Sequence, residues 1–313
     1  MTASFLVDGA FFLRRIRLNV TLSDNIVVRL LYYFFLMTCL WLSAAPALGQ
    51  QTPAPTPSPT PESETKKVEQ DIEDIFRIRK KRSSVTQTAD FGNVGQLEVG
   101  YSYSGLYRGP GYRSQHTGTL TVDLAATERI GLDFEFDSVD AQVDSSDVRT
   151  IGVGDSRLTA QFDLLDEKKG VPSFAVSYFM KFPAASVIKG LGTGRFDHKF
   201  TALVSKKARG VDIDINAALL INGKQGESGY LTGGEYSLAF SRDLTKKFNL
   251  LGEIFGETKD SDQPQGLFAS GVGSYQIGKK ANVNVGLIVG LTQASPRLGL
   301  NIGITFNAGN LYK

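Results

Sequence analysis

Residues 129–140, RIGLDFEFDSVD, carry the pattern on which the fold depends. Apolar side chains alternate here with glycine and carboxylates, which predicts a β-strand with one apolar and one polar face. In a soluble sandwich the carboxylates would face outside water, whereas in a membrane barrel they would face a wet lumen. The stretch by itself leaves both folds open.

Eleven further segments repeat this alternation after Asn93. Each is about ten residues long, which suits a tilted membrane-spanning strand, whereas soluble strands are typically about half that length. We therefore expect twelve strands, near 95–105, 117–126, 129–138, 156–165, 172–182, 196–206, 210–221, 233–243, 248–258, 266–277, 281–291 and 297–306.

The expected connections alternate in length. ATER, DEKKG, KKARG, TKK and GKK are short turns, whereas most of the connections between them are long, as in SGLYRGPGYRSQHTG. Short turns at one end and long loops at the other are typical of outer-membrane barrels, whose short turns lie in the periplasm. We predict an all-β fold, a closed antiparallel transmembrane β-barrel of about twelve strands that occupies residues 93–313.

Residues 1–49 have the composition of an export signal. Arginines precede the apolar run LLYYFFLMTCLWLSAAPALG (30–49), which ends in the small-residue pattern Ala47-Leu48-Gly49. We predict a signal peptide with a basic N-terminal arm, cleaved after Gly49. A retained transmembrane anchor is the alternative, since the run is near the length that spans a bilayer. Cleavage would remove Cys39, the single cysteine.

Two segments separate this signal from the barrel. Residues 50–65 are rich in proline and threonine, which predicts a disordered linker. Residues 66–82, KKVEQDIEDIFRIRKKR, have apolar residues at helical spacing, with acids early and bases late. We expect a short amphipathic helix and connector over 66–92, located in the periplasm. The basic run 79–82 could contact anionic lipid or a partner, or form a solvated helix end.

Charged and apolar residues fall on opposite parities of the expected strands, so the charged set should line the lumen. A charge facing lipid at mid-bilayer costs about 2–4 kcal/mol, which explains the separation. Acids outnumber bases, and an acidic lumen would influence which ions enter; the acids could instead pair with bases and brace the wall. The candidate lumen-lining residues are Glu98, Asp123, Arg129, Asp133, Glu135, Asp137, Arg157, Asp163, Lys181, Lys199, Asp212, Asp214, Glu235 and Glu253.

Motifs for catalysis, cofactors or metals are weak. His116 is expected in an outer loop and His198 on the lipid-facing parity, and neither lies in a recognisable serine-hydrolase motif. GLGTG (190–194) lacks the Lys-Ser/Thr of a phosphate loop. The acidic loops DSSD and DSDQPQ could attract Ca²⁺ or be solvated. We expect no enzyme activity, no cofactor and no metal. With 34 Lys+Arg against 32 Asp+Glu, no nucleic-acid partner is expected either.

Residues 152–183, GVGDSRLTAQFDLLDEKKGVPSFAVSYFMKFP, resemble the centre of a bacterial outer-membrane family labelled putative meta-pathway of phenol degradation. The matching features are the Gly154-Asp155 start, the polar turn before a Pro-started strand and the Lys181-Phe182-Pro183 exit. The next segment, TGRFDHKFTALVSKK (193–207), is similar too. The resemblance covers most of 93–306 and implies an outer-membrane channel or transporter.

We therefore expect a channel for passive passage of small solutes, with hydrophobic or aromatic compounds among the candidates. It would lie in the outer membrane of a Gram-negative-type bacterium, with its N-terminal segment periplasmic. The expected partners are outer-membrane lipid, the barrel-assembly machinery and a small solute. A non-transporting structural or adhesion barrel is the main alternative, and an outer-membrane enzyme is the third. Twelve strands give a narrow lumen, which inward side chains or the 66–82 helix could occlude.

Overall fold

The computed structural model describes residues 84–224, 228–258 and 266–312. The predicted signal peptide, the linker and the helix of 66–82 lie outside these residues. In the described part, no helix is long and apolar enough to cross a bilayer. The strands are β1 (Gln96–Gly109), β2 (Tyr112–Ala125), β3 (Ile130–Asp144), β4 (Arg149–Gly152), β5 (Ser156–Leu165), β6 (Ser173–Phe182), β7 (Asp197–Ala208), β8 (Val211–Gly223), β9 (Tyr230–Asp243), β10 (Phe248–Glu257), β11 (Leu267–Ile277), β12 (Ala281–Gly290) and β13 (Leu298–Asn310).

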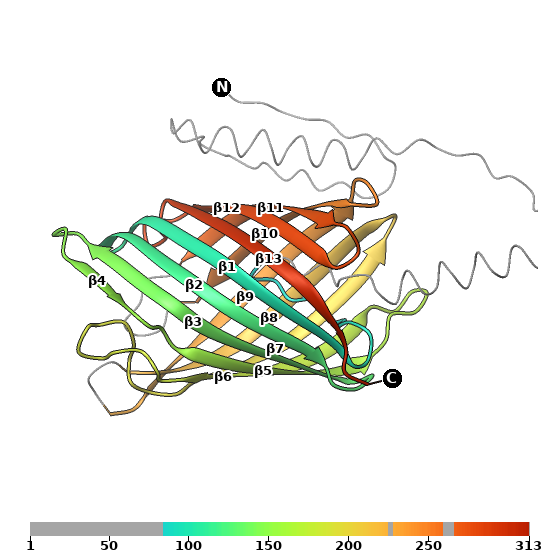
Figure 1. Cartoon of the computed structure of the whole chain (residues 1–313), viewed down its shortest axis with the longest axis horizontal. Coiled ribbons are helices and arrows are strands. Elements are labelled where there is room, and N and C mark those ends of the chain that lie inside the picture. The colour runs from blue at the N-terminus through green and yellow to red at the C-terminus, as the bar shows by residue number, and fades with distance from the viewer. Residues whose placement is uncertain (1–83, 225–227, 259–265, 313) are drawn as a thin grey trace, which may run out of the picture. The chain divides into compact units, whose positions relative to one another are not determined.

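Twelve of these strands close into an antiparallel barrel, as predicted (Figure 1). Sequential neighbours pair throughout, and β1 completes the ring by pairing with β13 from Gln96↔Asn310 to Tyr107↔Leu298. The short strand β4 pairs only with the far part of β3, while β5 pairs with the near part of β3. A closed ring leaves no unpaired edge, which is why an antiparallel sheet can stand in lipid.

Two expected loops are instead strand. β1 extends to Gly109 and β2 begins at Tyr112. The connection that we predicted to be long is therefore a hairpin with two residues outside the strands. Gly111 supplies the positive φ, 79°, that this turn requires. β3 likewise continues to Asp144 and returns through β4. The prediction was wrong for two reasons. The extensions of β1 and β2 carry polar side chains such as Arg108, Arg113 and Gln115, which interrupt the apolar alternation. On β3 the register shifts between Asp137 and Val139, so the apolar residues move from even positions to Val139, Ala141 and Val143.

The two faces of each strand have different chemistry, as the opening stretch predicted. On β3, Leu132 and Phe134 are outward and about two-fifths exposed (38% and 42%), whereas Asp133 and Glu135 line the interior. On β12, Val285 is 47% exposed while the adjacent Asn284 is 3% exposed. An outer surface of exposed large apolar side chains requires an apolar surrounding. The fold is therefore that of an outer-membrane barrel.

The interior also contains small apolar clusters. One consists of Ala239, Leu251 and Val272 on β9, β10 and β11. The other joins Ala175 and Leu203 on β6 and β7 to Ala89, which precedes the barrel in sequence. The second cluster shows that a segment before β1 packs inside the ring, which brings the N-terminal part of the described chain into the lumen.

Candidate functional site in the barrel lumen

Residues 84–92, which we call the strap, run inside the barrel ahead of β1 (Figure 1). Glu253 on β10, only 2% exposed, accepts hydrogen bonds from the strap. Its carboxylate receives the backbone N–H of Val85 (3.2 Å), the backbone N–H of Thr86 (3.0 Å) and the Thr86 hydroxyl (2.8 Å). The Ser270 hydroxyl on β11 also donates to it at 2.8 Å. Charge-assisted bonds of this kind are stronger than neutral ones.

Three further wall residues hold the middle of the strap. Asn216 on β8 accepts from the backbone N–H of Gln87 at 2.7 Å and donates to its carbonyl at 3.0 Å. The Ser205 hydroxyl on β7 accepts from the backbone N–H of Ala89 at 2.8 Å. Gln161 on β5 donates to the Ala89 carbonyl at 2.9 Å. The barrel wall thus binds an extended main chain through its side chains.

The strap covers one side of the lumen and leaves a cavity of about 590 Å³ on the other. Strap residues form one wall of this cavity, and β1, β2, β3 and β13 supply much of the rest. Seven of the fourteen predicted lumen residues line it: Glu98, Asp123, Asp133, Glu135, Arg157, Lys199 and Glu235. The cavity is therefore bounded on the β1–β3 side by carboxylates from three neighbouring strands.

The two cations in this cavity are held in ion pairs. Lys199 Nζ lies 3.2 Å from Glu235 Oε1 and 5.4 Å from the centroid of the Phe179 ring. Arg157 Nε lies 3.0 Å from Glu135 Oε2, and the other end of its guanidinium pairs with Asp137. Among the described lining residues, five carboxylates stand against these two cations, so the charged part of the lining is predominantly acidic.

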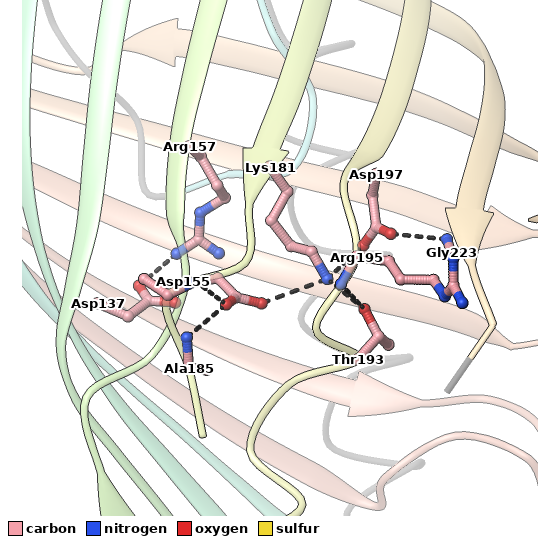
Figure 2. Close-up of polar contacts among 10 residues, drawn as sticks. Asp137, Asp155, Arg157, Lys181, Ala185, Thr193, Arg195, Asp197 and Gly223 are labelled. Carbon is pink, nitrogen blue, oxygen red and sulfur yellow. Dashed lines mark hydrogen bonds and ion pairs between the residues drawn. The ribbon is translucent and has the colours of Figure 1, made fainter. Parts of the chain in front are cut away.

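A second charged network lies at the loop end of β5, β6 and β7 (Figure 2). Lys181 Nζ lies between two carboxylates, 3.2 Å from Asp155 and 2.5 Å from Asp197. Asp155 also accepts the backbone N–H groups of Ala184 and Ala185 at 2.9 and 2.8 Å. The network ties the start of the β6–β7 connection, residues 183–196, to the barrel wall.

The remaining predicted residues lie away from the cavity. Asp214 is buried and accepts from Ser205 at 2.7 Å, so it supports a strap-binding side chain. Asp163 accepts from Gln161 at 3.1 Å. Asp212 lies 3.4 Å from Lys207 near the β7–β8 turn. Arg129 lies in the β2–β3 turn, outside the strand alternation, and is exposed.

Ion pairs at the short-turn end shift two pKa values. Hydrogen bonding to Asp166 raises the pKa of the Arg129 guanidinium. A hydrogen bond from Lys206 lowers the pKa of the Glu167 carboxyl, helped by the backbone N–H of Lys207. Both pairs join adjacent turns, so they connect neighbouring hairpins at the barrel rim.

Both histidines lie on strands beside tyrosine. His198 on β7 has its Nδ1 2.8 Å from the Tyr178 hydroxyl, and its ring stacks on the Tyr178 ring. His116 lies on β2, not in the outer loop that we predicted, with its Nδ1 2.7 Å from the Tyr103 hydroxyl. Aromatic groups of this kind form girdles in outer-membrane barrels. Across the described ranges, no cluster of three or more His, Cys, Asp or Glu side chains could hold a metal ion.

Sequence reasoning missed the strap site. Its wall residues Gln161, Ser205 and Asn216 are uncharged, and their inward parity was the only signal that the sequence offered. Asp155 appeared in the family pattern but was not assigned to the lumen. Its signal was its position next to Gly154, at the start of a strand whose charged inward residues, Arg157 and Asp163, were recognised.

Comparisons with known proteins agree with this architecture. The family model described as Putative MetA-pathway of phenol degradation matches residues 80–308, which confirms the resemblance seen in the sequence. Among solved structures, an outer membrane channel from Pseudomonas putida F1 is similar, with 13% identity and a TM-score of 0.55. That alignment covers 72% of this chain and 98% of that chain.

Two further solved structures are more distant. The KdgM porin in complex with disordered oligogalacturonate has 10% identity and a TM-score of 0.47, over 68% of this chain and 99% of that chain. The CymD monoaromatic hydrocarbon channel has 9% identity and a TM-score of 0.44, over 70% and 90%. No curated protein matches this sequence.

Proposed function

The chain belongs to the family described as Putative MetA-pathway of phenol degradation, and from that premise we propose that it is a passive outer-membrane channel for small solutes. The observation that carries the proposal is the cavity of about 590 Å³ inside the ring, between the strap and the β1–β3 wall. A barrel that served only as a scaffold would gain stability by filling this volume with side chains, as small barrels do.

The lining of the cavity favours small polar solutes, and cations in particular. Glu98, Asp123 and Asp133 come from three adjacent strands and line one side, while Lys199 and Arg157 are paired with acids. Rings or walls of carboxylates raise the local concentration of cations and lower that of anions. Passage would be passive, since the wall offers a charged surface rather than a closed binding pocket.

Aromatic solutes form the second candidate class. Phe255 and Phe268 stack at a centroid distance of 4.9 Å on β10 and β11, and Phe179 lines the cavity. Aromatic rings in a channel wall can hold the face of an aromatic solute. This candidate also accords with the family description.

Planar-bilayer recording of the purified protein tests the channel. We expect discrete conductance steps, and a reversal potential in a KCl gradient that indicates preference for K⁺ over Cl⁻. Neutralising Glu98→Gln, Asp123→Asn and Asp133→Asn together should move that potential toward the non-selective value. Asp147→Asn, an exposed residue outside the barrel lumen, is the matched control. Absence of conductance would refute the channel, and unchanged selectivity in the triple variant would refute the cation preference.

Solute flux separates the two candidate classes. Vesicles containing the protein should admit small cationic solutes faster than anionic solutes of equal size. Phenol crosses bilayers unaided, so a charged aromatic such as benzylammonium, compared with benzoate, is the suitable probe for the aromatic class. A barrel that admits neither class would be a structural or adhesion barrel.

A further inference from the structure

We propose that the strap, residues 84–92, is a releasable gate that divides the channel into a narrow state, as seen here, and a wider state in which the strap has left the wall. The proposal rests on the proposed channel function and adds to it a conformational device within the lumen. Four features of the strap and its anchors carry it.

The barrel does not depend on the strap for its integrity. The ring is complete through the β1–β13 and β2–β3 pairings. Every barrel strand has two strand neighbours without any contribution from residues 84–92. The bonds that hold the strap come from the side chains of Glu253, Asn216, Ser205 and Gln161. Release therefore breaks no strand ladder.

The strap is polar and buries little apolar surface. Of its side chains, Ala89 and Phe91 are the apolar ones packed inside, while Val85 remains 36% exposed and Asp90 is exposed. Burial of apolar area is the main driving force for tight packing. Hydrogen bonds exchanged against water contribute only modestly each. The strap is therefore bound by several weak contacts, and water in the lumen can take the place of its hydrogen-bond partners.

The chain is anchored to the barrel three residues after the strap, at a glycine. Gly95 has φ of 79°, a conformation that glycine adopts without strain. Its backbone N–H donates to the Ala125 carbonyl at 2.8 Å, and its carbonyl accepts from the Leu311 N–H at 2.8 Å. The chain is thus fixed to the barrel at Gly95 through its main chain, whereas the strap bonds at Thr86, Gln87 and Ala89 run to side chains of the wall. This fixed point allows the strap to swing without moving β1.

Glu253 is the main hydrogen-bond acceptor for the N-terminal end of the strap. Its carboxylate accepts three hydrogen bonds from Val85 and Thr86, and it is almost fully buried. A neutral amide in its place would keep the shape but weaken the charge-assisted bonds. We expect Glu253→Gln to raise the fraction of time spent in the wider state by about tenfold or more.

A disulfide lock tests the gate directly. The Thr88 and Ser205 hydroxyl oxygens lie 3.4 Å apart, one on the strap and one on β7, so Thr88→Cys with Ser205→Cys can join strap and wall. The native Cys39 is replaced by serine in this background. The control pair, Val99→Cys with Val122→Cys, joins facing residues of β1 and β2 that do not line the cavity, and it leaves the strap free.

Single-channel recording of the full-length protein gives the readout. Oxidised Thr88→Cys/Ser205→Cys protein should show only the lower conductance level. Reduction should restore transitions to a conductance level higher by about twofold, because release of the strap widens the lumen. The control pair should show both levels in either redox state.

Two other results would overturn the gate, and they differ from each other. If the locked protein shows the same levels before and after reduction, and Glu253→Gln leaves the levels and dwell times unchanged, the strap is a fixed structural element in a working channel. If no variant conducts, including one in which residues 84–91 are replaced by a Gly/Ser sequence, the channel function itself fails, and the gate with it.

Discussion

Placing a charge on the outer face of the barrel tests the assignment of its two faces. Leu287 lies near the middle of β12, is 51% exposed and faces away from the lumen, opposite Leu300 on β13 and Gly271 on β11. Arginine at a lipid-facing mid-bilayer position costs about 2–4 kcal/mol. Leu287→Arg should therefore lower the folding equilibrium constant by about 30- to 700-fold, at about 1.4 kcal/mol per factor of ten.

Reversible urea unfolding in phospholipid vesicles measures this change. Ser102→Arg is the matched lumen control, since Ser102 lines the cavity beside its carboxylates, and we expect it to change the free energy of unfolding by less than about 1 kcal/mol. Leu298→Arg, outward at the loop end of β13, should cost about 0–1 kcal/mol because the penalty falls toward the interface. Equal costs for Leu287→Arg and Ser102→Arg would refute the assignment of faces.

Two further predictions concern the ends of the barrel. Lys181→Met removes the cation between Asp155 and Asp197, so it should cost about 1–3 kcal/mol and speed hydrogen exchange in the β6–β7 connection; unchanged exchange there would contradict the anchoring role. Glu167 should titrate below its ordinary pKa, because Lys206 donates to its charged form. Its folded-state pKa is the lower one, so its contribution to stability is present above the unfolded-state pKa and is lost as the pH falls through the folded-state value. An NMR titration of the carboxyl carbon checks this, and Lys206→Gln should return the pKa toward its ordinary value; equal pKa values in both proteins would count against the pair.

Much of the fold follows from local pattern. A strand between lipid and a wet lumen needs an apolar residue at every second position, and this requirement is visible in β3 and β12 without any knowledge of their neighbours. The same reasoning failed in the extensions of β1, β2 and β3. On β1 and β2 polar side chains interrupt the alternation, and on β3 a register shift after Asp137 moves the apolar residues to the other parity.

The candidate site was predicted only in part. Parity placed Glu98, Asp133 and Glu135 on the inward face, and all three line the cavity. The alternation also predicted that Lys181 faces inward, but nothing in the sequence indicates its ion pairs with Asp155 and Asp197. Partners across strands depend on register, which is set by the pairing of the whole ring.

The sequence by itself determined which face the residues of the regular strand segments occupy, because facing is a property of the extended backbone and its period of two. Only the tertiary structure decided what lies opposite each inward residue. Thr86 and Glu253 are 167 residues apart in the chain, and they meet only because the closed ring brings β10 around to the strap. The strap, the cavity that it leaves and the pairing of the lumen cations all arise from that closure.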